Sequence, residues 1–481
     1  MKRKTEHFKI IKHARRYDKH ENKFIINIAY ETAAELTPRT IAVAEAFGLG
    51  IDQQQKFVIY DNVELKISPK DIVYITGDSG SGKSILLKTI KKDLEEVGEQ
   101  AIDMADIKVD PDKPIIETIG KTFQEALELL SRVGLNDAFL FLRKYKELSD
   151  GQKYRYKIAK LIESGKQWWI MDEFCSTLDR DTAKIVAYNL QKIARKHGKA
   201  AIAATTHTDL FQDLNPSVHI HKKFGKEIEV NYYPNKPAKE CSLIKEMRIE
   251  EGNFADYKKL AIFHYRSSRC PAPRKIFKLV RGEELCGVIV YSYPPPNTFG
   301  RSKVWKGTFQ QLQREISTIS RVIIHPKYRT IGLGAKLVKE TLAKAQTPYV
   351  ETLAVMAKYN PFFEKAGMQK IMENQPNKHV MHAIDQLHKL GFNPLMLSST
   401  KYVTQKIREI NKKEIIEILQ ELSRKEGTLR KRLISAHKVY PKHEEFVKKL
   451  NQLDEKGLAE VIKRLHFLSQ TKIYLFWNQK S

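Results

Sequence analysis

Eight residues early in the chain have the composition and spacing of a loop that binds the phosphates of a nucleoside triphosphate. The stretch GDSGSGKS, residues 77–84, satisfies the pattern GxxxxGK[ST], in which glycines let backbone N–H groups wrap around phosphate oxygens. Lys83 would reach the outer phosphates, and Ser84 would bind the accompanying magnesium ion. The residues expected to hold the nucleotide and Mg²⁺ here are Gly77, Ser79, Gly80, Gly82, Lys83 and Ser84.

Two adjacent carboxylates could complete the chemistry of phosphate transfer. The run WWIMDE, residues 168–173, is the pattern of a buried strand that ends in Asp172 and Glu173. Asp172 at the strand end would bind the metal ion, and Glu173 would orient the attacking water. These two segments together predict a site for nucleotide hydrolysis.

A second glycine-bearing turn offers a different kind of phosphate cradle. The stretch SRVIIHPKYRTIGLGAKLV, residues 320–338, predicts a strand, a turn and an amphipathic helix, with Arg329, Gly332 and Gly334 in the turn. Backbone N–H groups and the helix dipole would bind a phosphate group there. Because this turn lacks the Lys-Ser pair of the first loop, it suits a pyrophosphate without a metal ion. A glycine-bearing turn with no ligand is the alternative.

The segments that must position these residues predict an α/β multidomain protein. Strand runs alternate with helical patterns up to about residue 232, which favours a mostly parallel sheet. The proline-bearing stretch 232–243 indicates a domain boundary, and the stretch 274–294 beyond it predicts a hairpin. The expected organisation is a basic segment over 1–40, a phosphate-binding domain over 41–235, an α+β domain over 240–400 and a basic helical region over 401–481.

Composition indicates which partners and which cellular location to expect for this protein. The net charge of +27 over 481 residues favours a polyanionic partner, with nucleic acid or a ribonucleoprotein as the leading candidate. No apolar run is long enough to span a bilayer, and the N-terminus lacks the apolar region of a secretory signal. We therefore expect a cytoplasmic protein without a membrane partner. The four cysteines have neither disulfide nor zinc-site spacing and are expected to be reduced thiols.

Three further motifs give the first domain a resemblance to a known family. LSDGQ at 148–152 is similar to the LSGGQ signature, STLDR at 176–180 to the loop after the catalytic glutamate, and TTHTD at 205–209 contains the switch histidine, His207. With the phosphate loop and the carboxylate pair, these motifs resemble the ATP-binding-cassette (ABC) ATPases over roughly residues 40 to 232.

The resemblance implies a homodimer that holds ATP and Mg²⁺ in a head-to-tail sandwich. Ser149, Gly151 and Gln152 of one protomer would close on ATP held by the phosphate loop of the other. Hydrolysis with Glu173 and His207 would then release the dimer.

The first domain departs from the family pattern in two places. Asp150 stands where the signature usually has glycine, and we expect its carboxylate to cap the following helix. No clear glutamine loop is recognisable, and Gln100 is the nearest candidate. For the aromatic residue that stacks on adenine, Phe47 is preferred over Phe57.

The second cradle also carries a resemblance. The R-x-x-G-x-G turn, the phrase IIHPKYR before it and NPFFEKAGM at 360–368 resemble the GNAT acetyltransferases, over roughly residues 240–400. This resemblance implies that Arg329, Gly332 and Gly334 bind the pyrophosphate of acetyl-CoA.

Acetyl transfer requires a base for the attacking amine and an acid for the leaving thiolate. GNAT enzymes often use a tyrosine as the acid, but that position is Phe363 here. Tyr359, one helical turn upstream, is the candidate to replace it, and the alternative is that Tyr359 only packs. Glu315 and Glu351 are the best candidates for the base. His325 and His264 are weaker alternatives for that role.

These observations leave two functions open. In the first, the protein binds and hydrolyses ATP and transfers an acetyl group from acetyl-CoA to a macromolecule such as RNA, DNA or an associated protein. In the second, it is an ATP-gated switch that binds nucleic acid or ribosomes, and its GNAT-like domain is not catalytic.

Overall fold

The structure is a computed structural model of the whole chain, in which two compact units are distinguished. It describes residues 8–32, 37–48, 55–135, 138–263, 270–354, 361–434, 441–469 and 471–479. The first unit comprises Met1–Val290 and Arg321–Thr341, and the second comprises Tyr291–Ser320 and Leu342–Ser481. The expected boundary near residue 240 therefore does not separate two compact units, because the first unit also contains the second cradle.

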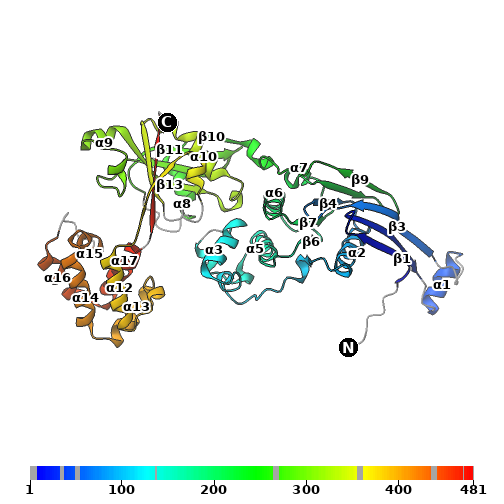
Figure 1. Cartoon of the computed structure of the whole chain (residues 1–481), viewed down its shortest axis with the longest axis horizontal. Coiled ribbons are helices and arrows are strands. Elements are labelled where there is room, and N and C mark those ends of the chain that lie inside the picture. The colour runs from blue at the N-terminus through cyan, green and yellow to red at the C-terminus, as the bar shows by residue number, and fades with distance from the viewer. Residues whose placement is uncertain are drawn as a thin grey trace. The chain divides into compact units, whose positions relative to one another are not determined.

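A six-stranded sheet forms the centre of the first unit (Figure 1). Its strand order is β5-β6-β7-β4-β8-β9, and all neighbouring pairs are parallel except β8 with β9. The strands are β4 (Ile72–Thr76), β5 (Ala101–Asp103), β6 (Trp168–Met171), β7 (Ala200–Ala204), β8 (Val218–Lys222) and β9 (Ile228–Tyr232). Every residue of β4, β6 and β7 is buried, as expected for parallel strands covered on both faces. The prediction of a mostly parallel sheet is confirmed.

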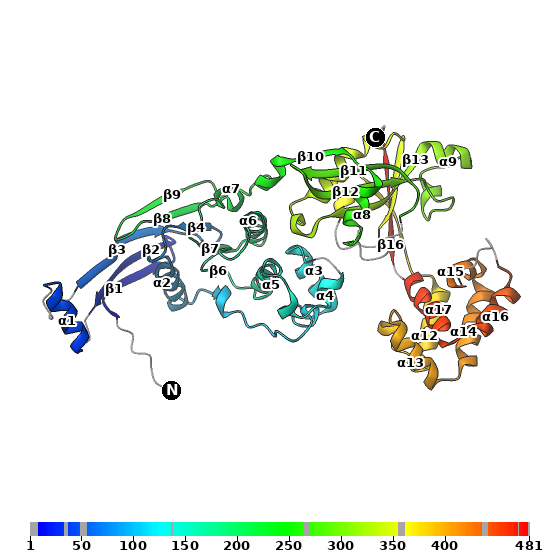
Figure 2. The same ribbon diagram turned by 180° about the vertical axis from the view of Figure 1, so that it is seen from behind.

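Two layers cover this sheet, and alternate residues of β6 point into them. Trp169 packs in the hydrophobic cluster that also includes residues of α3, α5 and α6, whereas Trp168 packs in the cluster that includes residues of α2. Figures 1 and 2 show α2 and α6 on opposite sides of the strands. The helices of this region are α2 (Lys83–Glu96), α3 (Phe123–Arg132), α4 (Ala138–Phe141), α5 (Asp150–Glu163), α6 (Arg180–Lys196) and α7 (Phe211–Leu214).

An antiparallel sheet of β1 (Phe8–Asp18), β2 (Lys23–Thr32) and β3 (Gln55–Lys66) precedes the phosphate loop, with α1 (Pro38–Ala46) between β2 and β3. The expected boundary at residue 40 is therefore wrong, because β2 pairs with β3 across it. Buried and partly buried residues alternate over residues 23–28 of β2, and Phe24 and Ile26 are buried in the same cluster as Trp168. The basic composition of residues 1–40 gave no indication that this segment folds as part of the first domain.

A seven-stranded sheet has the order β10-β11-β12-β13-β14-β16-β15. The elements of this region are β10 (Met247–Glu251), α8 (Phe254–Ala261), β11 (Pro273–Arg281), β12 (Glu284–Ser292), α9 (Phe309–Glu315), β13 (Ile316–Ile324), α10 (Leu333–Thr341), β14 (Tyr349–Ala354), α11 (Phe362–Lys365), β15 (Gln369–Asn374) and β16 (Lys472–Asn478). β16 pairs antiparallel with both β14 and β15. The expectation of helix to the end of the chain is thus wrong for β16.

The helices that follow β15 and precede β16 in the sequence share a hydrophobic core and are grouped together in the second unit (Figure 2). They are α12 (Lys378–Lys389), α13 (Thr400–Glu409), α14 (Lys412–Lys425), α15 (Arg430–Ile434), α16 (His443–Gln452) and α17 (Glu455–Leu468). The helical region therefore begins at α12 and not at residue 401 as expected. Val380 and Leu387 of α12 are buried in the common core. Among the described residues, no helix combines the length and the apolar character needed to cross a membrane.

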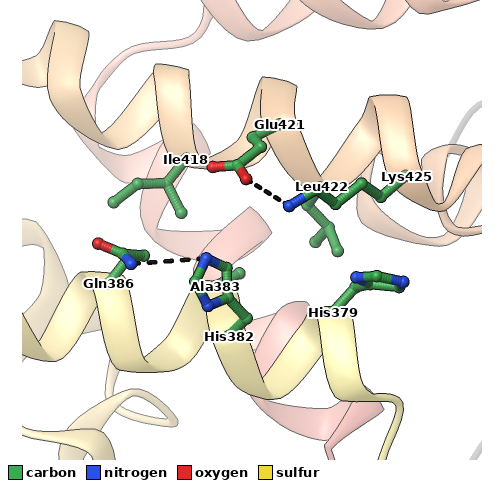
Figure 3. Close-up of a pocket in the computed structure, with 8 residues that line it drawn as sticks. All are labelled: His379, His382, Ala383, Gln386, Ile418, Glu421, Leu422 and Lys425. Carbon is green, nitrogen blue, oxygen red and sulfur yellow. Dashed lines mark hydrogen bonds and ion pairs between the residues drawn. The ribbon is translucent and has the colours of Figure 1, made fainter.

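A small cavity lies between two of these helices. His382 and Gln386 of α12 and Glu421 and Lys425 of α14 are among its lining residues (Figure 3). Its volume of about 10 Å³ is close to that of a single water site. This cavity is therefore too small for a substrate.

A buried ion pair lies in the second unit. The Glu351 carboxylate is fully buried and accepts hydrogen bonds from Arg301 Nε at 2.9 Å and Arg301 Nη2 at 2.6 Å. The hydroxyl groups of Thr318 and Tyr474 also donate to it, each at 2.9 Å. These donors compensate a charge that would otherwise be costly to remove from water.

The variant Arg301→Met should lower the free energy of unfolding by about 3–5 kcal/mol, because it leaves the Glu351 carboxylate buried without its cation. The double variant with Glu351→Met should recover a large part of this loss. Urea unfolding of the two variants and the wild type measures the difference. A single variant as stable as the wild type would contradict this role of the ion pair.

Candidate functional site

The first phosphate loop lies between β4 and α2, and its conformation requires glycine. Gly77, Gly80 and Gly82 have φ values of 141°, 76° and 103°. A Cβ atom on Gly77 would lie 2.0 Å from the carbonyl oxygen of Lys222, and one on Gly82 would lie 2.6 Å from a side-chain carbon of Ile59. The backbone can therefore turn tightly enough to point N–H groups at a phosphate.

Lys83 lies inside this loop at the start of α2. Its Nζ atom donates to the carbonyl oxygens of Gly77 and Asp78 at 2.8 and 2.6 Å, and the residue is 8% exposed. Burial lowers the pKa of Lys83, and the negative charge of Asp172 opposes that effect. The ammonium group is thus positioned within the loop before any ligand contact.

The carboxylate pair lies at the same edge of the sheet as the phosphate loop. β6, β7 and β4 are parallel neighbours, so Asp172, which follows β6, and Gly77, which follows β4, come from the carboxyl ends of their strands. Asp172 and Glu173 are exposed, and the Glu173 N–H donates to Asp172 Oδ1 at 2.9 Å. Glu173 has a φ of 48°, in the left-handed region that non-glycine residues rarely adopt.

The groups available to Mg²⁺ are the Ser84 hydroxyl and the Asp172 carboxylate. Both are oxygen ligands and both residues are exposed, which fits an ion that retains waters and binds substrate phosphates. Within the described part of the chain, no cluster of three or more His, Cys, Asp or Glu side chains could hold a metal ion alone.

His207 follows β7, and its backbone is fixed by two contacts. Its N–H donates to Thr205 Oγ1 at 3.3 Å, and its carbonyl oxygen accepts a hydrogen bond from the Tyr74 hydroxyl. The residue is half-buried at the same carboxyl edge. A histidine held here suits a switch position near the outer phosphate.

Sequence reasoning missed several residues that support the loop. The Tyr60 hydroxyl donates to the Gly82 carbonyl at 3.0 Å, and the Thr76 hydroxyl lies 3.0 Å from ring nitrogens of both His219 and His221. These contacts connect strands that are distant in sequence. No local pattern could have identified them.

The signature forms the N-terminus of α5. Ser149 is its N-cap: the Ser149 side chain accepts from the Gln152 N–H at 3.4 Å, and the Gln152 side chain accepts from the Ser149 N–H at 3.1 Å. The expectation that Asp150 caps the helix is therefore wrong, because Asp150 occupies the first turn with 75% of its side chain exposed. Gly151 is required for packing, since a Cβ there would lie 2.9 Å from Thr182 Cγ2.

The candidate for the glutamine loop does not fit that role. Gln100 precedes β5, and β5 is parallel to β6, so Gln100 lies at the amino edge of the sheet, away from Asp172. Of the adenine-stacking candidates, Phe47 is 76% exposed after α1 and Phe57 is 52% exposed on β3. Phe57 shares its strand with Tyr60, which contacts the phosphate loop.

The second cradle has the expected strand, turn and helix, formed by β13 and α10. Gly332 in the turn has a φ of 93°, and Arg329 Nε donates to the Ile324 carbonyl at 3.2 Å. Gly334 lies in the first turn of α10. Thr330 has a φ of 79°, which is strained for a β-branched residue.

Two residues of the first domain contact this strained turn. Asn189 Nδ2, on α6, donates to Thr330 Oγ1 at 2.6 Å. A Cβ on Gly134 would lie 2.4 Å from Thr330 Cγ2, so only glycine permits this approach. Neither partner could be recognised from the sequence, because both are distant from the turn along the chain.

An ion-pair cluster also connects α6 to the segment before the second cradle and to β11. Asp181 accepts hydrogen bonds from Lys327 Nζ and Arg281 Nη1, both at 2.7 Å. Burial by itself raises the pKa of Asp181, but the hydrogen bonds and charges of these two cations lower it further, so that the net shift is downward. The cluster stabilises folding as long as Asp181 is ionised.

The candidate acid and base groups of the second domain lie in different environments. Glu315 is partly exposed and accepts a hydrogen bond from Trp305 Nε1 at 3.2 Å. Glu351 is the buried carboxylate of the ion pair with Arg301, and this arrangement does not suit a base that must accept a substrate proton. Phe363 is 6% exposed within α11.

The remaining candidates lie outside the described residues or have structural roles. Tyr359 and His264 lie outside the described ranges. His325 Nδ1 accepts from the Lys327 N–H at 3.3 Å and its ring contacts Phe263 and Tyr328. Burial lowers the pKa of His325, which is consistent with a neutral ring that caps the turn.

Comparisons with known proteins show what the first domain is similar to. Residues 60–133 match the family model described as ABC transporter. The alpha-hemolysin translocation ATP-binding protein HlyB of Escherichia coli O157:H7 is 29% identical over 182 residues, which are 30% of this chain and 25% of that protein. The cytochrome c biogenesis ATP-binding export protein CcmA of Gluconobacter oxydans is 29% identical over 167 residues, or 32% of this chain and 76% of that protein. The chain therefore contains an ABC-type, ATP-binding ATPase domain of the P-loop fold.

Further matches are of the same kind. The methionine import ATP-binding protein MetN of Helicobacter hepaticus is 28% identical over 193 residues, and the match covers 54% of its length. The chain thus spans a quarter of HlyB and about half of MetN. A solved dimer of an ATP-binding cassette bound to ADP and Pi has a TM-score of 0.30 and 21% identity, covering 36% of this chain and 91% of that one.

The relatives correct one expectation about partners. Their names describe translocation, export and import, and the matching family model is described as ABC transporter. The expectation that the protein has no membrane partner conflicts with this finding. The absence of an apolar span from the sequence was therefore insufficient evidence for it.

The variant Lys83→Ala should raise the Kd for ATP with Mg²⁺ at least about tenfold, since a charge-assisted hydrogen bond contributes roughly 1.5–3 kcal/mol. Lys88→Ala is the matched control, because Lys88 is an exposed residue of the same helix. Isothermal titration calorimetry measures both affinities. Equal affinities for the two variants would contradict the assignment of Lys83.

Proposed function

We propose that the protein is an ATP-hydrolysing ABC ATPase that closes as a homodimer and uses its second domain to transfer acetyl groups from acetyl-CoA to a macromolecule. The position of Lys83 inside the glycine loop, beside the charge of Asp172, is the observation that carries the ATPase part. Ser84 and Asp172 would hold Mg²⁺, Glu173 would orient the attacking water, and His207 would contact the outer phosphate. Because ATP is the substrate, we expect a cytoplasmic location for this domain.

Dimer closure would require the signature of one protomer to face the loop of the other. Ser149, Gly151 and Gln152 lie at the N-terminus of a 14-residue helix, whose dipole favours a phosphate. One cassette per chain would make the sandwich a homodimer. ATP would then join two chains, and hydrolysis would separate them.

In the variant Glu173→Gln, ATP with Mg²⁺ should convert monomers to dimers that persist, because the ligand binds but the water is not activated. Light scattering of the variant with and without ATP measures the mass. The double variant Lys83→Ala/Glu173→Gln is the control and should remain monomeric. A Glu173→Gln protein that is monomeric in saturating ATP would rule out the sandwich.

The second domain supports an acyl-donor site through two local features. The turn with Arg329, Gly332 and Gly334 precedes α10, as a pyrophosphate site requires. Within the described residues, β13 and β14 pair only over Ile316–Thr318 and Tyr349–Glu351, although β13 continues to Ile324. The later part of β13 could pair with an extended ligand such as the pantetheine arm.

Transfer would proceed by attack of a neutral amine on the thioester carbon, with release of the coenzyme thiolate. Glu315, directly or through water, is the carboxylate that remains available to accept the amine proton. Tyr359 is the candidate that would protonate the thiolate. The tetrahedral intermediate then collapses to the acetylated acceptor and coenzyme A.

The variants Gly332→Glu and Gly334→Glu should abolish acetyl-CoA binding, because a carboxylate beside the turn repels the pyrophosphate. Gly282→Glu is the control for backbone strain, since Gly282 also has a positive φ, of 58°, and open space around its Cα. Calorimetry with acetyl-CoA measures the affinities. Unchanged binding by both cradle variants would show that this turn is not an acyl-donor site.

One observation favours the second function, an ATP-gated switch with a non-catalytic acyl-CoA domain. Phe363 has no hydroxyl group, and Glu351 is locked in an ion pair, so two of the expected chemical positions are inert. The net charge of +27 favours nucleic acid or a ribonucleoprotein as partner in either case. Incubation of RNA, DNA and protein fractions with labelled acetyl-CoA separates the two: labelled product supports transfer, and saturable binding without product supports the switch.

A further inference from the structure

A cavity of about 470 Å³ lies at the N-terminus of α5, within the first compact unit. Ser149 and Gly151 of the signature line it, together with Lys327 and Arg329 of the second cradle. Its volume is within the range of sites for small molecules, about 300–1,000 Å³. The cavity therefore brings two segments with phosphate-binding patterns together.

Arg155 is a buried cation at this cavity. The residue is 6% exposed and lines the cavity, and its Nη2 donates to the Lys327 carbonyl at 3.3 Å. Its Nε atom has no hydrogen-bond partner among the described residues. The Nε atom is shielded from solvent, so an anion in the cavity would stabilise the buried guanidinium through its charge rather than through this N–H.

The charges that line the cavity favour an anion. Its cations are Arg155, Lys327 and Arg329, and its carboxylates are Asp150 and Asp179. The N-terminus of α5 adds partial positive charge. Burial lowers the pKa of Arg155 to about 10, and the charge of Arg329 contributes to that shift, so the cations repel one another when nothing neutralises them.

We propose that this cavity binds the phosphate groups of a nucleotide, and that Arg155, Lys327 and Arg329 add contacts to those of the signature. The ligand is either the ATP held by the other protomer or the adenosine phosphates of coenzyme A, which share the same chemistry. Only the choice between these sources rests on the proposed function. The cationic site itself follows from the geometry of one chain.

The Lys83→Ala protein, whose own phosphate loop is weakened, tests the cavity with inorganic tripolyphosphate as the probe. Calorimetry should show binding, and adding Lys327→Ala should weaken it about tenfold, as expected for one charge-assisted contact. Lys327→Arg should retain the affinity within about threefold, because the charge is kept.

Asp181→Asn is the matched control in the same background. It removes the ion pair with Lys327 but leaves the ammonium group, and Asp181 does not line the cavity. It should therefore bind tripolyphosphate at least as well as the parent protein. Absence of probe binding, no effect of Lys327→Ala, or an equal loss in Asp181→Asn would each overturn the proposal.

Two further titrations identify the source of the phosphate. If Lys327→Ala raises the ATP concentration needed to dimerise Glu173→Gln but leaves coenzyme A binding unchanged, the ligand is the ATP of the other protomer. If the reverse holds, it is coenzyme A. Failure of Glu173→Gln to dimerise, or of the chain to bind acetyl-CoA, would contradict the proposed function, whereas the tripolyphosphate result stands independently of both.

Discussion

The contact of Asp181 with Lys327 and Arg281 connects the ATPase domain to segments that follow it in the first compact unit. Asp181 is in the first turn of α6, directly after the nucleotide-site loops, whereas both cations come from beyond the cassette. A carboxylate that is 20% exposed is stable only when nearby cations compensate its loss of water. This ion-pair cluster therefore fixes the turn that precedes α10 against the helices of the ATPase domain.

The strain at Thr330 is maintained by other contacts within the same unit. A β-branched residue with positive φ persists only where its surroundings hold it, and here Asn189 and Gly134 of the ATPase domain do so. If nucleotide binding moves α5 and α6, the support of this turn changes. The two phosphate cradles are thus physically connected, although their sequences suggest independent domains.

Features that depend on local chemistry could be predicted from the sequence. The glycine loop at 77–84, the strand that ends at Met171, the signature helix and the turn before α10 are specified by short patterns with a direct backbone consequence. Features that depend on distant partners were not predictable. Strand β16 enters a sheet whose other strands lie at least 98 residues earlier in the chain, and Glu351 was mistaken for a base because Arg301 is 50 residues away.

The physical connection between the two cradles predicts that ATP binding at the first loop alters the second cradle. Hydrogen–deuterium exchange of the full chain, with and without ATP and Mg²⁺, measures this directly in the segment 326–338. The account predicts altered backbone exchange in that segment for the wild type and no change for Lys83→Ala. Exchange at 326–338 that does not respond to ATP, while the first loop becomes protected, would contradict it.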